Sequence, residues 1–562
     1  MKKTNQGWPI LLALLLILST LPGQEPEKDA RITGTNIHYE QGDWVSYSMT
    51  RLVRSLAVGR EYVYFGTTGG VTRYNYFSNR WDEPWTVSNG LADNFIITVA
   101  FDMNTDYFWC STRQGISLYR STFQRWENIF KDDLGLSPDD EIASIGFDAY
   151  HVWLETMNGT VFKGANQQTA FERVAISDVP FNTIEWFGRR VTDLSDLPLL
   201  TMSGGNFFDQ DGYVRDYRLN KYDVTCFHRD RWNTYWVGSW GAGAGKADAR
   251  IELLEMMPFG LFCENVTAAK MDDEYQIWMG GHGYREEESG ITRWDSENNE
   301  WVYFQSRFIG DLKSDQVSAI ALDKPYVWFA TDYGVAYFNC DENEWRTFDV
   351  GNGLADNIVY DVETDGEIVW IATAKGVSQL IKANMGQKEF RITDFVPQDI
   401  RRMAAYDIAL MTNLLWIGTE FGLYVYDLQA KTGGFENESD GPQNNEVTVV
   451  ECFQDKEVWV GFRDGIQVFD VTSQQWLGSP ERQLFDSREI NFIKADEFSV
   501  WVATNSGALR YDRDRKRWIE FTILDGLISN CVNCIMLDGD YVWFGTDAGL
   551  TKFYWNDPNR ID

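Results

Sequence analysis

Histidine is scarce in this sequence of 562 residues, which has only His38, His151, His228 and His282. No two of them have the spacing of metal ligands, and none belongs to a known hydrolase motif. The 84 acidic residues make chance carboxylate pairs inevitable, so no general acid or base is assigned. The sequence therefore predicts no catalytic residue, no metal site and no cofactor.

The seven cysteines are too few and too scattered for a disulfide scaffold in a chain of this length. Cys531 and Cys534 have the C-x-x-C spacing of zinc and redox sites. They fall in Asn530–Leu537, however, which has the pattern of a β-strand, and residues three apart on a strand point to opposite faces. We therefore expect two small strand residues rather than a zinc or redox site.

Long hydrophobic runs are absent after the N-terminus. There, Lys2 and Lys3 precede the apolar run Ile10–Leu18, and small residues follow as far as Gly23. This order is typical of a secretory signal peptide over residues 1–23, and the run is too short to span a bilayer. We expect a protein that is exported to the periplasm, the cell surface or the medium, without an integral membrane segment.

Positive charge is also in deficit, because 50 basic residues stand against 84 acidic ones and the formal net charge is -34. Such a surface repels nucleic acid and anionic lipid. Solubility is the simpler explanation of the acidity. Calcium binding is the alternative, but no segment has the spacing of an EF-hand. Nucleic acid is therefore excluded as an expected partner.

Aromatic residues are abundant, at 15% of the chain with 24 Trp, and they belong to a repeat. The repeat runs aromatic, apolar, Gly or Ala, Thr, two variable residues, Gly, apolar. Six good copies begin at Tyr64, Trp328, Trp370, Trp416, Trp501 and Trp543, five looser copies centre on Trp109, Trp153, Trp236, Trp278 and Trp459, and a degenerate copy covers Leu199–Asn206. The resulting twelve copies lie mostly 42 to 46 residues apart.

Each period encodes four strands. The second Gly permits a tight hairpin, a polar turn and an aromatic outer strand follow, and a Gly-Leu loop leads to the next inner strand. Four strands in a period near 44 residues predict a β-propeller blade. The fold class is therefore all-β, a β-propeller of about twelve four-stranded blades. Neighbouring blades should pack through stacked Trp and Phe residues.

Closure of the rings can also be predicted. Known propellers close with four to eight blades, so we expect two tandem propellers of about six blades, over residues 43–300 and 301–555. A single twelve-bladed ring is the alternative. Asp43–Tyr47 has the pattern of an outer strand and Leu550–Tyr554 that of a third strand. We expect these segments to pair, so that residues 43–48 complete the last blade and remove a free edge.

The motifs resemble the two-component regulator propeller repeat. The resemblance rests on the loop Gly526-Leu527…Asn530…Val532 and the hairpin Trp543…Gly545-Thr546…Gly549-Leu550, and it covers Asp43–Tyr554. In that family such propellers form the periplasmic ligand-binding part of hybrid sensor kinases, often for glycan fragments. Similar propellers occur in surface and secretion-associated proteins of Gram-negative bacteria. Because no kinase, DNA-binding or membrane segment follows the repeats, we do not expect this chain to transduce a signal itself.

Two hairpins depart from the repeat. The run Gly241–Lys246 looks like a phosphate loop, but it lacks the required first Gly, because that position is Trp240. The hairpin of the Trp236 repeat is one residue longer and carries Trp240, and the hairpin of the Trp278 repeat is six residues longer. We predict that both lie on one face and bind a ligand through Trp240, His282, Tyr284, Arg285 and Glu286. A drifted surface loop is the simpler alternative.

The sequence therefore favours an exported, non-catalytic propeller that binds a glycan-like ligand or an envelope protein. The alternative is a propeller enzyme, such as a polysaccharide lyase or a glycoside hydrolase. A tight group of His, carboxylate and Tyr side chains around a central pocket would favour the enzyme. A channel lined by small residues would favour the binding protein.

Overall fold

Strands make up most of the structure, which is a computed structural model. It describes Tyr39 and residues 42–190, 197–198, 200–202, 207–208, 213–215, 220–283, 289–385, 391–395, 400–436, 446–463, 465–477, 482–485, 488–558 and 560. The predicted signal peptide and the site residues Tyr284, Arg285 and Glu286 lie outside these ranges. Among the described residues, the α-helix is a single turn, α2 (Arg482–Phe485), as the all-β prediction requires.

The described residues form eleven sheets, of which nine are four-stranded and two are larger than the repeat predicts. Four sheets come first along the chain: β2 (Val53–Val58), β3 (Tyr62–Thr67), β4 (Gly70–Asn75), β5 (Arg80–Trp85); β6 (Ile96–Asp102), β7 (Tyr107–Thr112), β8 (Gly115–Arg120), β9 (Arg125–Phe130); β10 (Ile142–Phe147), β11 (His151–Thr156), β12 (Val161–Ala165), β13 (Phe171–Val174), β14 (Glu185–Gly188); and β15 (Thr201–Met202), β16 (Phe207–Phe208), β17 (Tyr213–Arg215), β18 (Lys221–Arg229), β19 (Thr234–Trp240), β20 (Gly243–Asp248), β21 (Leu253–Met257). The extra strand β14 pairs with the inner strand β10, and β17 pairs with β18.

Seven sheets follow: β22 (Val266–Met271), β23 (Gln276–Gly281), β24 (Ile291–Asp295), β25 (Glu300–Phe304); β26 (Val317–Asp323), β27 (Tyr326–Thr331), β28 (Gly334–Asn339), β29 (Glu344–Phe348); β30 (Val359–Thr364), β31 (Ile368–Thr373), β32 (Gly376–Ile381), β33 (Thr393–Phe395); β34 (Ala405–Met411), β35 (Leu414–Thr419), β36 (Gly422–Asp427), β37 (Thr432–Phe435); β38 (Val447–Phe453), β39 (Glu457–Phe462), β40 (Gly465–Asp470), β41 (Gln475–Trp476); β42 (Ile490–Ala495), β43 (Ser499–Thr504), β44 (Gly507–Asp512), β45 (Arg517–Phe521); and β46 (Val532–Asp538), β47 (Tyr541–Thr546), β48 (Gly549–Tyr554), β1 (Trp44–Tyr47). Short 3-10 turns lie at Val87–Asn89, Lys131–Leu134, Ile176–Asp178, Phe181–Thr183, Val350–Asn352 and Lys382–Asn384.

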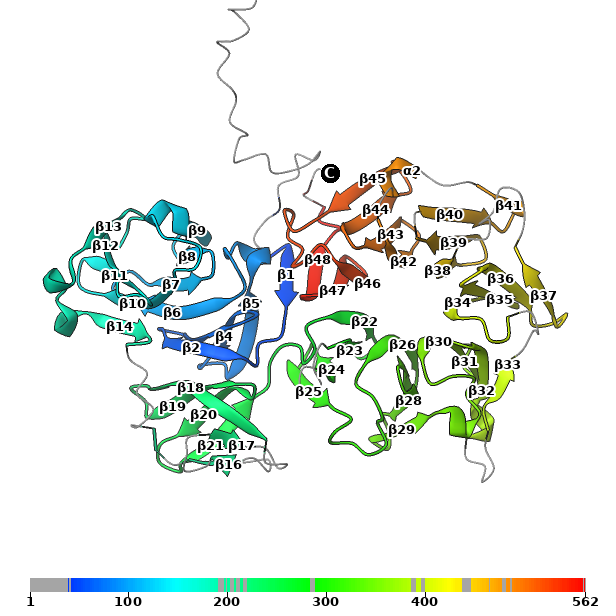
Figure 1. Cartoon of the computed structure of the whole chain (residues 1–562), viewed down its shortest axis with the longest axis horizontal. Coiled ribbons are helices and arrows are strands. Elements are labelled where there is room, and N and C mark those ends of the chain that lie inside the picture. The colour runs from blue at the N-terminus through cyan, green and yellow to red at the C-terminus, as the bar shows by residue number, and fades with distance from the viewer. Residues whose placement is uncertain are drawn as a thin grey trace, which may run out of the picture. The chain divides into compact units, whose positions relative to one another are not determined.

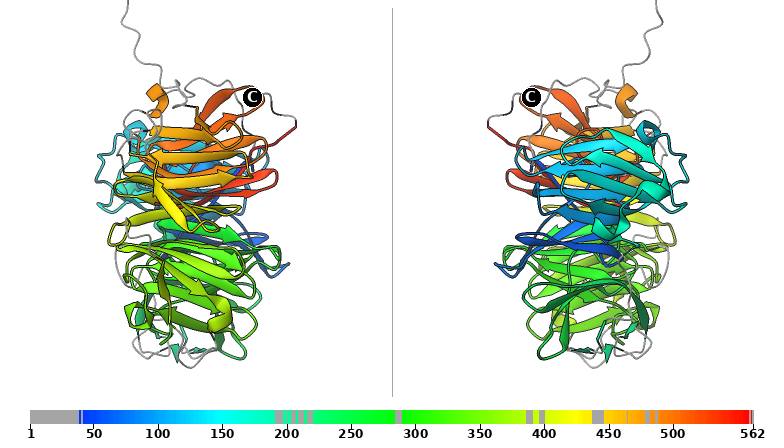
Figure 2. Two further views of the ribbon diagram at one scale, coloured as in Figure 1. Left: turned by 90° about the vertical axis from the view of Figure 1, so that its right-hand side faces the viewer. Right: turned by 90° about the vertical axis from the view of Figure 1, so that its left-hand side faces the viewer.

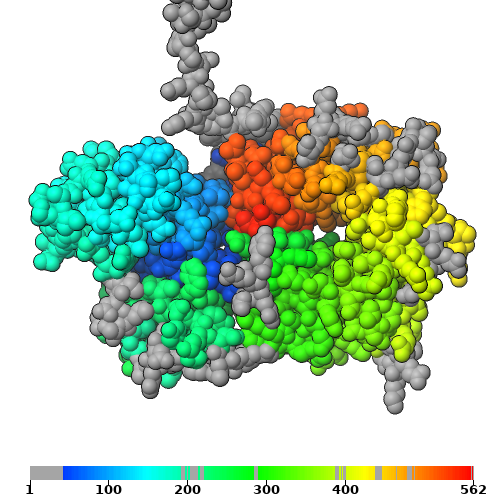
Figure 3. All heavy atoms as spheres, viewed as in Figure 1, coloured from blue at the N-terminus to red at the C-terminus, as the bar shows by residue number. Residues whose placement is uncertain are grey.

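The inner strands show which sheets are neighbours. In the later group, β22, β26, β30, β34, β38, β42 and β46 each contact the next, and β46 contacts β22 (Figure 1). In the space-filling view of Figure 3, the later residues, coloured from green to red, gather around one another. In the earlier group, β18, β2, β6 and β10 contact one another in that order. Figure 2 shows from both sides that neighbouring sheets stack face to face. The all-β propeller-like architecture is thus present, whereas the expected count of about twelve blades is not confirmed.

The chemistry of the repeat explains its hairpins. In the β27–β28 hairpin the hydroxyl of Thr331 donates to the carbonyl of Gly334 at 2.7 Å and accepts from the amide of Tyr333 at 3.2 Å. The Trp of the repeat is buried between its own sheet and the next. Trp278, for example, is fully buried and packs with Val317 and Phe329. The predicted aromatic packing between sheets is therefore observed.

The predicted pairing of the two ends is confirmed. Strand β1 pairs antiparallel with β48, from Trp44 opposite Phe553 to Tyr47 opposite Leu550. The Trp44 ring stacks on Phe553 with centroids 3.9 Å apart. Gly526 of the last Gly-Leu loop lies against the same indole, because a Cβ there would be 2.3 Å from its Cγ. The loop Gly is thus required by the close approach of Trp44.

Candidate functional site

An aromatic cluster lies where the sheet of β2–β5 meets the sheets of β22–β25 and β46–β48. We call it the junction cluster, and it consists of Tyr47, Trp81, Phe259, Trp294, Trp301 and Trp543, all buried. Trp294 and Trp301 stack with centroids 4.5 Å apart, and Trp81 and Phe259 are 4.9 Å apart. Cavities lie on both sides of the cluster, and Trp81 and Phe259 border both.

The first cavity, which we call the polar cleft, has a volume of about 790 Å³. It is lined by Tyr47, Arg73, Arg80, Trp81, Asp82, Glu83, Phe259, Met271, Tyr275, Trp294, Ser296, Glu297, Asn299, Asp538, Asp540, Tyr541, Trp543 and Lys552. Aromatic side chains and charges of both signs therefore face one space. Such a lining suits a polar ligand that also offers apolar faces.

Several contacts position the charged groups of the cleft. The Lys552 ammonium lies 3.9 Å from the centroid of the Tyr541 ring, and burial lowers the pKa of Lys552 against the opposing effect of Asp538 and Glu83. The indole nitrogen of Trp543 donates to an Asp538 carboxylate oxygen at 3.2 Å. These contacts fix a cation, an anion and aromatic surface at known positions.

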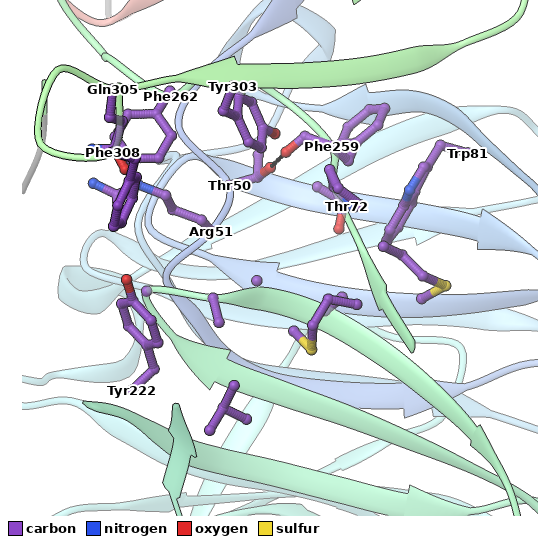
Figure 4. Close-up of a pocket in the computed structure, with 18 of the residues that line it drawn as sticks. Thr50, Arg51, Thr72, Trp81, Tyr222, Phe259, Phe262, Tyr303, Gln305 and Phe308 are labelled. Atoms are coloured by element: carbon purple, nitrogen blue, oxygen red, sulfur yellow. Dashed lines mark hydrogen bonds between the residues drawn. The ribbon is translucent and has the colours of Figure 1, made fainter. Parts of the chain in front are cut away.

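The second cavity, which we call the apolar pocket, has a volume of about 470 Å³ (Figure 4). It is lined by Thr50, Arg51, Thr72, Trp81, Val214, Tyr222, Gly241, Ala242, Gly243, Ala244, Met256, Met257, Pro258, Phe259, Phe262, Tyr303, Gln305, Phe308 and Ile309. The Arg51 guanidinium lies 4.2 Å from the centroid of Phe262. The hydroxyl of Tyr303 donates to the carbonyl of Gly260 at 2.9 Å, so it is already bonded.

The Trp240 hairpin borders the apolar pocket. The amides of Gly241 and Gly243 both donate to the carbonyl of Arg51 at 3.0 Å, and Trp240 forms a bridge with Leu52. The Trp240 side chain is 41% exposed and does not line the pocket. It is therefore a surface residue beside the pocket rather than part of the core.

A third cavity is the central channel of the seven-sheet cycle, lined by the inner strands. Each of these strands has a register shift around its second residue, for example at Asn491, Asn533 and Thr448. The side-chain amide of Asn491 donates to the backbone carbonyl of Val532 at 2.7 Å. The side-chain amide of Asn533 donates to the backbone carbonyl of Val266 at 3.1 Å. The shifted residues thus link neighbouring sheets around the channel.

Charged side chains also line the channel. Burial, followed by the neighbouring Asp361 carboxylate, raises the pKa of Asp407 well above its usual range. Burial, followed by Asp361, raises the pKa of Glu363 to about 7. Glu451 and Lys494 form an ion pair at 2.8 Å. None of these residues belongs to the Trp and Gly pattern by which the repeat is recognised in the sequence.

His282 lies at the mouth of this channel, in a cavity of about 520 Å³. Its Nε2 is 3.3 Å from the Ser318 hydroxyl, and burial lowers the pKa of His282, so the ring is mainly neutral near pH 7. Glu446 and Arg463 border the same mouth. Nearby, burial, followed by a hydrogen bond to Glu446, raises the pKa of Tyr406 to about 12.

The predicted site residues that the structure describes therefore border different cavities. Trp240 lies beside the apolar pocket, whereas His282 lies at the channel mouth. Tyr284, Arg285 and Glu286 lie outside the described residues, so a shared binding surface stays a prediction.

None of the seven cysteines, all of which lie in the described ranges, forms a disulfide bond. Cys534 is buried in β46 and Cys531 is half-buried just before it. Among the described residues, no three His, Cys, Asp or Glu side chains are grouped to hold a metal ion. In the same part of the chain, no helix has the length and apolar character needed to cross a membrane.

Comparison with known proteins gives structural matches only: no family model and no curated protein matches the chain. PorZ, a bacterial surface component of the type-IX secretion system of Porphyromonas gingivalis, matches with a TM-score of 0.58 and 13% identity over 91% of this chain and 87% of PorZ. The extracellular domain of the proposed hybrid two-component system BT4673 from B. thetaiotaomicron has a TM-score of 0.46 and 15% identity, over 90% of this chain and 70% of that domain. The corresponding domain of BT3049 from the same organism has a TM-score of 0.43 and 14% identity, over 94% and 77%.

These identities show a likeness of fold. At 13% identity the match to PorZ shows the fold alone, and in its fold this chain is similar to PorZ.

Proposed function

We propose that this chain is an exported, non-catalytic propeller that binds a polar, glycan-like ligand in the polar cleft. The observation that carries the proposal is the lining of this cleft, which combines aromatic side chains with charges of both signs. Sugar rings offer apolar C–H faces and polar hydroxyl edges, so they match such a lining. The likeness of fold to a bacterial surface protein and to extracellular domains supports export.

Two residues of the cleft serve as probes. Tyr275 is 50% exposed in the turn before β23, and the half-buried Lys552 lies over Tyr541. Replacing either residue changes the cleft without removing the junction cluster. Tyr333, which is 47% exposed and lies outside the cleft, is a matched control for Tyr275.

The test is a glycan array followed by calorimetry with the glycan that binds best. We expect Tyr275→Ala and Lys552→Met to weaken binding by about tenfold each, and Tyr333→Ala to leave it unchanged. Unchanged affinity in both cleft variants would place the site elsewhere. Capture of an envelope protein by a wild-type chain that binds no glycan would support the partner alternative.

One observation favours the alternative that the chain is an enzyme. His282, Glu446 and Arg463 border the channel mouth, and Tyr406 is close to Glu446. These are residue types that a polysaccharide lyase uses for proton transfer and charge neutralisation. Release of unsaturated sugar products from the bound glycan, lost in His282→Ala, would replace the binding proposal with this one.

We also infer a finer architecture from the contacts of the inner strands. The closed cycle from β22 to β46 is a seven-bladed propeller, completed by β1, and the sheets of β18, β2, β6 and β10 belong to a second propeller. This assignment groups β22–β25 with the later sheets, whereas the sequence suggested a boundary near residue 300. Seven blades lie within the range in which propellers close.

A further inference from the structure

The longer hairpin between β19 and β20 has a structural consequence. In the standard repeat, two residues separate the Thr from the turn Gly, whereas Trp240, Gly241 and Ala242 separate Ser239 from Gly243. The capping bonds survive, because the Ser239 hydroxyl donates to the carbonyl of Gly243 at 3.0 Å and accepts from the amide of Ala242 at 3.1 Å. The hairpin therefore keeps its turn and accommodates one additional residue.

Where it lines the apolar pocket, the hairpin presents only glycine and alanine, from Gly241 to Ala244. Gly243 has φ +85°, and a Cβ built there would find its nearest neighbour, the Arg51 Cα, at 3.8 Å. A Cβ at Gly241 would lie 2.6 Å from the Tyr222 ring, so this position requires glycine. The Gly-Ala run, which only superficially resembles a phosphate loop, is thus the bare floor of the apolar pocket.

Aromatic rings form the opposite wall. Figure 4 shows Tyr222 on the side of the hairpin strands, Phe262, Tyr303 and Phe308 on the other side, and Arg51 between them. Met256 and Met257 add polarizable thioethers to the lining. The result is a slot between the Gly-Ala backbone, with Tyr222 beside it, and a wall of aromatic rings on the other side.

We propose that the apolar pocket binds an uncharged small molecule that contains a flat aromatic ring system. A flat ring fits the slot, offers a π face to Phe and Met contacts, and can be approached by the Arg51 guanidinium, which already lies over Phe262. The volume of about 470 Å³ lies within the range of small-molecule sites. Because Trp81 and Phe259 separate it from the polar cleft, the pocket is a second site, independent of the glycan proposal.

The test uses N-phenyl-1-naphthylamine, an uncharged aromatic dye that fluoresces in apolar sites. We expect saturable binding to the full chain. Ala242→Leu, which fills the floor, should weaken it by at least about tenfold, and Phe308→Ala, which removes part of the wall, by about fivefold. Ala430→Leu, at an exposed turn between β36 and β37, should leave it unchanged. Circular dichroism would establish that each variant is folded.

Two outcomes would overturn the proposal: wild-type protein binds no dye at saturation, or both pocket variants retain wild-type affinity. In the first case, loss of envelope-protein capture in Ala242→Leu would assign the pocket to an aromatic side chain of a partner. Tyr275→Ala should not affect dye binding, so failure of the glycan proposal and failure of this one are distinguishable.

Discussion

The carboxylates of the channel hold neighbouring inner strands together. An Asp361 oxygen accepts from the amide of Ile408 at 3.0 Å, and an Asp407 oxygen accepts from the amide of Val450 at 2.6 Å. Each bond joins one inner strand to the next. The channel is therefore lined by groups whose protonation is coupled to the packing of the sheets.

Glu363 makes this coupling measurable. Its pKa is raised to about 7 in the folded chain, so the folded state binds this proton more tightly than the unfolded state does. The stabilisation is complete below about pH 4.5 and is lost as the pH rises toward 7. We expect Glu363→Gln to remove this loss and to be more stable than wild type at pH 8 by about 1–2 kcal/mol.

The measurement is the free energy of unfolding in urea at pH 5 and pH 8. Glu367→Gln, at an exposed position of the turn between β30 and β31, is the control and should keep the wild-type decline. An equal decline in Glu363→Gln would show that other groups cause it.

The channel residues were missed because the sequence analysis compared only turns and Trp positions. After the register shift, the inner strands β22 and β26 carry Ala268 and Ala319, whereas β30 and β34 carry Asp361 and Asp407. Aligning the repeats on this position would have revealed the carboxylates. Their pKa values, however, depend on neighbours contributed by other sheets, which one repeat does not encode.

At the scale of the element, strands and hairpins follow from the repeat, because each is encoded locally by Trp, Thr and Gly. The pairing of β1 with β48 could be predicted for the same reason, since both segments match defined strands of the repeat. The grouping of sheets could not be derived, because it depends on the packing of inner strands from different repeats. The junction cavities were missed because their walls come from β5, the Phe259 segment and β25.

Strand β1 should be essential for the last sheet. Trp44 is 2% exposed and stacks on Phe553, so Trp44→Ala creates a cavity and loosens the strand that covers the edge of β48. We expect the free energy of unfolding to fall by about 3–5 kcal/mol and light scattering to reveal aggregation on heating. Trp232→Ala, at a residue that is 42% exposed, should lower it by less than about 1 kcal/mol. Equal effects of the two substitutions would contradict the role of β1.

At the scale of the molecule, the chain passes through the junction twice. Residues 48–52 lead from β1 to β2, and residues 258–265 lead from β21 to β22. Hydrogen bonds join these two connecting segments, the two crossings of the junction. The Thr50 hydroxyl donates to the carbonyl of Phe259 at 2.6 Å, and the backbone amide of Leu261 donates to the carbonyl of Ser48 at 3.0 Å. Both crossings also line the apolar pocket, so a ligand there contacts the connection between the two groups of sheets.

Phe259 should therefore couple the unfolding of the two groups. Its ring packs against Trp81 at 4.9 Å and Trp301 at 5.4 Å, which belong to different groups of sheets. We expect Phe259→Ala to split the calorimetric transition into two, because the junction cluster loses the ring that lies between the groups. Phe338→Ala, which removes a buried ring between two sheets of the seven-sheet cycle, should lower the midpoint without separating the transitions. A single transition in Phe259→Ala, with the wild-type enthalpy, would show that the remaining contacts of the junction suffice to keep the two groups coupled.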